Sequence, residues 1–124
     1  DAGVRDQLEE GIRRVATNIA AAMGAVADVD YHRGYPVTVN DDQATVWAAD
    51  VAREISGGVN MDMQPMMGGE DFSYMLNERP GAYIWVGNGD TAMVHHPAYN
   101  FNDDAIPAGS SWYAGMVEAR MPAA

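Results

Sequence analysis

Two adjacent histidines, His95 and His96, are the side chains of this sequence best suited to metal chemistry. They follow an apolar run, residues 82–86, that predicts a buried central strand, and ligand sites collect where the strands of α/β sheets end. A neutral imidazole in such a place is a natural metal ligand. Neighbouring side chains of an extended segment point in opposite directions, so at most one of the two should face a given metal. Spacing alone leaves packing or capping open as the alternative use.

Two glycines and two acids, Gly68, Gly69, Glu70 and Asp71, stand together where a short helix is predicted to begin. One interpretation is structural: glycines allow a tight turn, and the helix dipole favours acids in the first turn. The other is functional: the backbone approaches a ligand closely, and Gly69 and Glu70 bind substrate. The residues alone do not decide between the two.

The other polar candidates favour structural roles. His32 lies on the polar face of a predicted strand and is interpreted as a surface histidine. Asp103 and Asp104 precede the last predicted helix and are interpreted as an N-cap pair. The sequence contains no Walker loop and no HExxH motif, and no Ser–His–Asp arrangement stands out.

The elements that must position these residues follow from hydrophobic periodicity and from turn residues. Three-to-four spacing and capping signals predict four helices, over residues 1–24, 41–56, 70–77 and 105–120. Alternation or apolar runs predict three strands, over residues 25–33, 59–66 and 82–86. The pattern therefore indicates an α/β protein, with a hinge or domain boundary near residues 34–41.

Composition narrows the function classes. The 124 residues include 18 acids, seven Arg and no Lys, for a formal charge of −11. Such a surface repels phosphate backbones and anionic lipids, so neither nucleic acid nor membrane is expected as a partner. The absence of cysteine rules out disulfides and thiolate sites within the sequence. No signal peptide is visible at Asp1, and we expect a cytoplasmic protein.

Several segments, in order along the chain, resemble those of one enzyme family. Residues 67–74, MGGEDFSY, are similar to the M-G-[GS]-E-D-F-[SA]-Y segment of the aminoacylase and hippurate hydrolase branch of the peptidase M20 family. The PGAY of residues 80–83 and the GNG of residues 87–89 follow in the order of that branch. Residues 94–103, VHHPAYNFND, resemble its L-H-[NS]-P-x-Y-x-F-N-D segment, and residues 33–40, RGYPVTVN, resemble its R-G-Y-P-P-T-x-N stretch.

The resemblance implies an amidohydrolase that cleaves the amide bond of N-acyl amino acids or similar conjugates. It implies an α/β catalytic domain with two divalent metal ions, zinc or manganese, and an inserted α+β lid that serves homodimerisation. Residues 1–38 would be the second half of the lid, a helix plus a strand, and residues 39–124 the C-terminal part of the catalytic domain. His95 would be a metal ligand, with His96 in the variable position.

The resemblance also implies what this chain does not contain. The family's other metal ligands and its general-base Glu lie in the N-terminal part of the catalytic domain, and nothing in these 124 residues corresponds to them. We therefore expect no catalytic residue in this chain and no activity from it alone. One alternative is a non-catalytic dimerisation or binding module that uses an exposed strand edge at Val26–Tyr31. A further alternative is a small self-contained enzyme that uses Glu70, Asp71 and His95.

Overall fold

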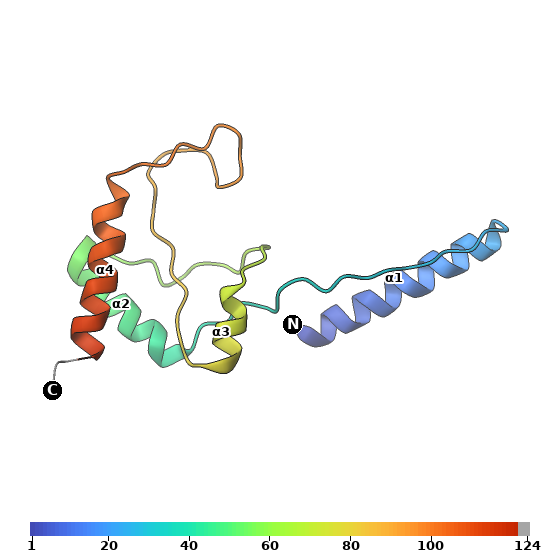
Figure 1. Cartoon of the computed structure of the whole chain (residues 1–124), viewed down its shortest axis with the longest axis horizontal. Coiled ribbons are helices and arrows are strands. Elements are labelled where there is room, and N and C mark those ends of the chain that lie inside the picture. Colours follow the sequence, from blue (N-terminus) through green and yellow to red (C-terminus); the bar gives the residue numbers. More distant parts are fainter. Residues whose placement is uncertain (122–124) are drawn as a thin grey trace.

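The computed structural model describes residues 1–121 and shows a helical chain (Figure 1). Within these residues the helices, in chain order, are α1 (Ala2–Ala22), α2 (Asp42–Ser56), α3 (Phe72–Glu78) and α4 (Ala105–Arg120). Turns and extended segments connect them. None of the helices described is both long and apolar enough to cross a bilayer. The four helices predicted from periodicity are confirmed to within about two residues at each end.

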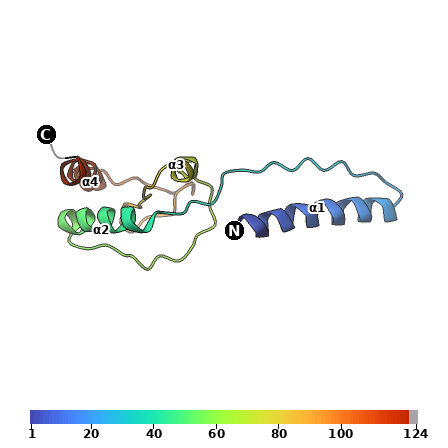
Figure 2. The same ribbon diagram turned by 90° about the horizontal axis from the view of Figure 1, so that it is seen from below.

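Helix α1 and the segment that follows it form an arm, residues 1–35, that projects from the rest of the molecule (Figure 1). Asp1 caps the helix by accepting hydrogen bonds from the amides of Gly3 and Val4 at 2.7 and 3.2 Å. Gly24, with φ of 72°, turns the chain back, and residues 25–35 return alongside α1 (Figure 2). The apolar stripe of α1 remains exposed, including Leu8 at 58%.

The core lies between α2 and α4, which pack against each other. Helix α2 begins at the N-cap Asp41, whose side chain accepts from the Ala44 amide at 2.8 Å, and it ends at Gly57 with φ of 74°. Ala48 of α2 is almost fully buried, and its carbonyl accepts a 3.0 Å hydrogen bond from the indole of Trp112 in α4. This bond fixes the register of the two helices.

The predicted α/β fold is wrong for the described residues, because residues 1–121 contain no strand. Residues 25–33 are extended, but α1 side chains take the place of a neighbouring strand: Arg13 donates to the Val29 carbonyl at 2.6 Å, and Arg33 pairs with Glu9 at 2.6 Å. Val26 is 98% exposed. The predicted strand edge at Val26–Tyr31 is therefore absent, and the dimerisation alternative loses its basis in strand pairing.

The other two predicted strands are also absent. Residues 59–66 are exposed coil. Residues 82–86 were predicted as a buried central strand, but Trp85 and Val86 are each about half exposed. The run is anchored instead by Asn40, whose side-chain amide bonds both backbone groups of Tyr83. Alternation and apolar runs predict an extended conformation, but a strand also requires a neighbouring strand, which the described residues do not provide.

Gly115→Ala should destabilise the α2–α4 core. A Cβ on Gly115 would lie 2.9 Å from the Val51 side chain and 3.6 Å from that of Ile55. Overpacking of this kind costs about 1–3 kcal/mol, which exceeds the ~1 kcal/mol that alanine gains in helix propensity. Thermal or urea unfolding measures the difference in free energy.

Gly11→Ala in α1 is the matched control, because no atom lies within 4 Å of the added Cβ. It should stabilise the chain by about 0.5–1 kcal/mol. Equal stabilisation by both substitutions would show that α2 and α4 do not pack as described.

Candidate functional site

His95 occupies an unusual backbone position in the His loop, residues 93–99. Its φ is 68°, and it is the only described non-glycine residue with positive φ. Two consecutive turns hold it there: the His96 amide donates to the Met93 carbonyl at 3.1 Å, and the Tyr99 amide donates to the His96 carbonyl at 2.9 Å. Non-glycine residues in this region carry a conformational cost and cluster at functional sites.

The two histidines of the loop differ in what their rings do. Nδ1 of His96 accepts a hydrogen bond from the Ala98 amide at 3.0 Å, so this ring supports the loop from within. The His95 ring is exposed and makes no hydrogen bond to the described residues. Of the pair, His95 is therefore the one whose imidazole is available to a ligand.

Asn88 closes the base of the His loop. Its side-chain amide donates to the Asn100 carbonyl at 2.8 Å, and its carbonyl oxygen accepts from the Asn102 amide at 2.7 Å. The Asn102 side chain in turn accepts from the Asp104 amide at 3.0 Å. Asp104 occupies the N-cap position of α4, as predicted, but its side chain makes no capping hydrogen bond. No role for Asn88 was predicted from the sequence.

The glycine loop, residues 68–71, lies against the ring of Tyr35. A Cβ on Gly69 would lie 3.0 Å from the Tyr35 ring, whereas a Cβ on Gly68 would meet nothing within 4 Å. The close packing at Gly69 therefore depends on the absence of a side chain, whereas a side chain at Gly68 would have room. This close approach involves the protein's own ring, so the structural interpretation of Gly69 has direct support.

Glu70 is engaged within the protein. Its carboxylate accepts from the Phe72 amide at 3.1 Å at the start of α3, and its carbonyl accepts from the buried hydroxyl of Ser73 at 2.6 Å. The Phe72 amide and the Tyr83 hydroxyl hold the pKa of the Glu70 carboxyl below its usual range. The same carboxylate raises the pKa of the Tyr83 phenol above its usual value. Glu70 thus links the start of α3 to the run that contains Tyr83.

Glu70→Gln should lower the pKa of Tyr83 toward its usual value of about 10, because the substitution removes the charge that stabilises the protonated phenol. In the wild type, the Tyr83 contribution to stability is complete below the unfolded pKa and is lost as pH rises through the raised folded pKa. The Glu70 contribution is present above its unfolded pKa and is lost as pH falls through its lowered folded pKa.

Ultraviolet titration of phenolate formation measures this effect, with Tyr83→Phe to identify the Tyr83 signal. Glu78→Gln, at the last residue of α3, is the charge-matched control. If Tyr83 titrated identically in wild type and Glu70→Gln, the two side chains would not interact.

Asn40 holds Tyr83 through its backbone. Its side-chain nitrogen donates to the Tyr83 carbonyl at 2.9 Å, and its oxygen accepts from the Tyr83 amide at 2.8 Å. The Asp41 amide adds a 3.0 Å bond to the Gly81 carbonyl. Sequence reasoning assigned no role to Asn40 or Tyr83, although both lie in segments that carry the family resemblance. Their place in those segments was the only feature of the sequence that could have indicated a role.

The structure does not gather the candidate residues into one centre. Among residues 1–121, no three His, Asp or Glu side chains lie close enough together to hold a metal ion. Glu70, Asp71 and His95 therefore do not form a shared site, and the self-contained enzyme has no structural support. His32 is exposed and pairs with Asp30 at 3.0 Å, as expected of a surface histidine. His95 can supply one ligand, but the described residues do not complete a metal site.

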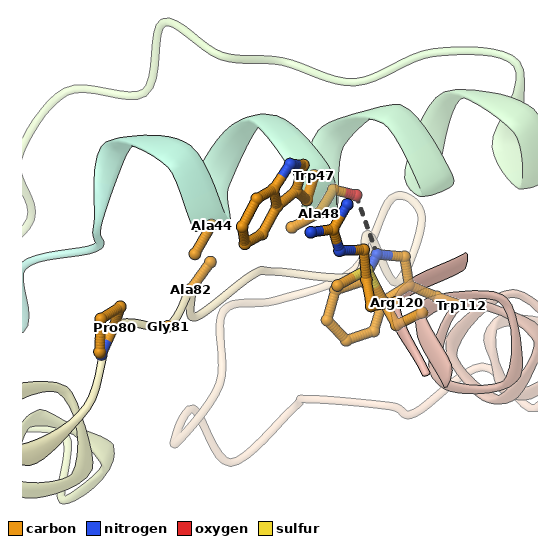
Figure 3. Close-up of a pocket in the computed structure, with 9 residues that line it drawn as sticks. Ala44, Trp47, Ala48, Pro80, Gly81, Ala82, Trp112 and Arg120 are labelled. Carbon is orange, nitrogen blue, oxygen red and sulfur yellow. Dashed lines mark hydrogen bonds between the residues drawn. The ribbon is translucent and has the colours of Figure 1, made fainter. Parts of the chain in front are cut away.

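An open cleft of about 350 Å³ lies between α2, α4 and residues 80–82 (Figure 3). The Arg120 guanidinium stacks over the Trp47 ring at 3.6 Å from its centre, and both residues line the cleft. None of the candidate residues lines this cleft, so it is separate from both the glycine loop and the His loop.

Known proteins similar to this chain are hydrolases and deacetylases. It is 31% identical to the hippurate hydrolase of Campylobacter jejuni, over 94% of this chain and 31% of that protein. It is 32% identical to the N-acetylcysteine deacetylase of Bacillus subtilis, over 90% of this chain and 29% of that protein. It is 30% identical to an N-acetyldiaminopimelate deacetylase of Streptococcus thermophilus, over 80% of this chain and 26% of that protein. No solved structure matches the chain.

By their names, these relatives are hydrolytic enzymes. Residues 4–119 match the family described as Peptidase family M20/M25/M40, and the chain belongs to this family. It spans less than a third of the length of the relatives named above. The predicted family resemblance is confirmed.

Proposed function

We propose that this chain is the C-terminal part of a metal-dependent amidohydrolase that cleaves the amide bond of N-acyl amino acids. Family membership and the names of the relatives, which include a hippurate hydrolase and N-acetylamino acid deacetylases, support the reaction class. His95 supports the proposed metal site. Two turns hold its backbone at positive φ, and its imidazole makes no hydrogen bond to the described residues. Its counterpart in the resembling segment is a metal ligand.

In this proposal, His95 contributes one ligand to a two-metal centre of zinc or manganese, and the remaining ligands come from parts of the enzyme outside this chain. The described residues contain no group that could hold a metal ion alone. The chain by itself is therefore proposed to be inactive, with no catalytic residue of its own.

The proposed division into residues 1–38, from the lid, and residues 39–124, from the catalytic domain, agrees with the projection of the α1 arm (Figure 1). The exposed apolar stripe of α1, which includes Val4, Leu8 and Ile12, supports the proposed homodimer. Substrate binding at the glycine loop is proposed for the backbone at Gly69. The Glu70 carboxylate already accepts a hydrogen bond from the Phe72 amide, and Tyr83 lowers its pKa.

A hydrolysis assay of the complete protein tests the proposed function. The substrates are hippurate, N-acetylcysteine and a panel of other N-acetyl amino acids, each with added zinc or manganese. Release of the free amino acid, abolished by a chelator and restored by one of the metals, is the expected result. Failure of every substrate with either metal would contradict the proposal.

A further inference from the structure

Tyr35 connects the segment before α2 to the glycine loop and to α3. Its ring contacts Gly69 so closely that a Cβ there would lie 3.0 Å away. The same ring meets Tyr74 of α3 edge-on, with ring centres 6.0 Å apart and planes at 80°. Its hydroxyl makes no hydrogen bond to the described residues, so the ring itself carries these contacts.

Arg5 fixes the backbone of Tyr35 from α1. One guanidinium nitrogen donates to the Tyr35 carbonyl at 2.9 Å, and the other donates to the Gly34 carbonyl at 2.8 Å. A planar guanidinium that holds two successive carbonyls restrains both the position and the direction of the chain. A continuous set of contacts therefore runs from α1, through Arg5 and Tyr35, to Gly69.

We infer that Tyr35 is a positioning residue for the glycine loop, and that Arg5 couples the orientation of the α1 arm to that loop. A movement of the arm that shifts Gly34 and Tyr35 must change the packing on Gly69. This inference rests on the proposed function only where it concerns substrate, because the contacts themselves do not depend on the reaction.

Hydrogen exchange of residues 66–71 in the complete protein tests the coupling without any substrate. Tyr35→Ala should increase exchange in this segment, and Tyr35→Phe, which keeps the ring, should behave as wild type. Arg5→Ala should give a smaller increase, and Arg14→Ala, an exposed arginine of the same helix, should give none. Unchanged exchange in Tyr35→Ala, or equal exchange in Tyr35→Phe and Tyr35→Ala, would overturn the positioning role. Equal exchange in Arg5→Ala and Arg14→Ala would overturn the link to the arm.

Kinetics of the complete enzyme test the consequence for substrate. Tyr35→Ala should raise KM about tenfold and change kcat less, because it loosens a loop that binds substrate. Gly69→Ala should raise KM in wild type but much less in Tyr35→Ala, where the ring that meets the new Cβ is gone. A fall in kcat at constant KM, or equal effects of Gly69→Ala in both backgrounds, would contradict the inference. An inactive wild type would refute the proposed function, while the exchange experiment would still decide the coupling.

Discussion

His95→Asn in the complete enzyme is expected to lower kcat/KM about 1000-fold or more while it leaves the fold intact. The lost imidazole is the proposed metal ligand, and a metal contributes several kcal/mol to this class of reaction, each 1.36 kcal/mol being a factor of ten. Asn tolerates positive φ, so the backbone at 68° should be preserved. His95→Gly, which relieves the same backbone constraint, should lose activity equally. Steady-state hydrolysis measures the loss of kcat/KM, and thermal unfolding measures whether the fold remains intact.

Two further histidines provide controls within the same chain. His32→Asn should retain full activity, because His32 is exposed and pairs only with Asp30. His96→Asn should lower activity by no more than about 100-fold, because it removes a bond that supports the loop and leaves the His95 ring in place. Full activity of His95→Asn would exclude His95 as a ligand. An equal loss of unfolding free energy in His95→Asn and His96→Asn, with none in His32→Asn, would assign the effect to the loop.

The 124-residue chain alone is expected to bind zinc or manganese only as weakly as a single imidazole. Structural zinc sites derive a binding free energy of about 10–16 kcal/mol from several ligands around one ion. The described residues offer no such group. Isothermal titration calorimetry of the isolated chain, next to the complete protein, measures the difference.

The complete protein should bind metal several orders of magnitude more tightly than the chain alone, and His95→Asn should weaken that tight binding. In the isolated chain, His95→Asn should change metal binding little, because that binding is already weak. Tight stoichiometric binding by the 124 residues alone would mean that a metal site exists within them.

The helices could be predicted from the sequence because their signals are local. Asp41 and Gly57 delimit α2 with a cap and a left-handed stop that depend only on neighbouring residues. The three predicted strands are absent from the described residues, because a strand depends on a partner that no local pattern specifies. Residues 25–33 alternate as a strand would, but α1 contacts them through the side chains of Arg13 and Glu9 instead.

The candidate site could likewise be predicted only in part. His95 was identified by family resemblance, and its positive φ could not have been predicted from its residue type. Asn88 and Asn40 hold backbone groups 12 to 14 and 43 residues away, contacts that have no periodic signature. For Glu70, the sequence left a structural and a functional interpretation open. The hydrogen bond from the Phe72 amide, and the mutual effect of Glu70 and Tyr83 on their pKa values, favour the structural one.

The proposed function is tested by comparing two purified proteins in one assay: the complete protein and the 124-residue chain alone, each with hippurate and N-acetylcysteine in the presence of zinc or manganese. We expect release of the free amino acid by the complete protein and none by residues 1–124. Turnover by the 124-residue chain, or no turnover by the complete protein with any substrate and metal, would contradict the proposed function.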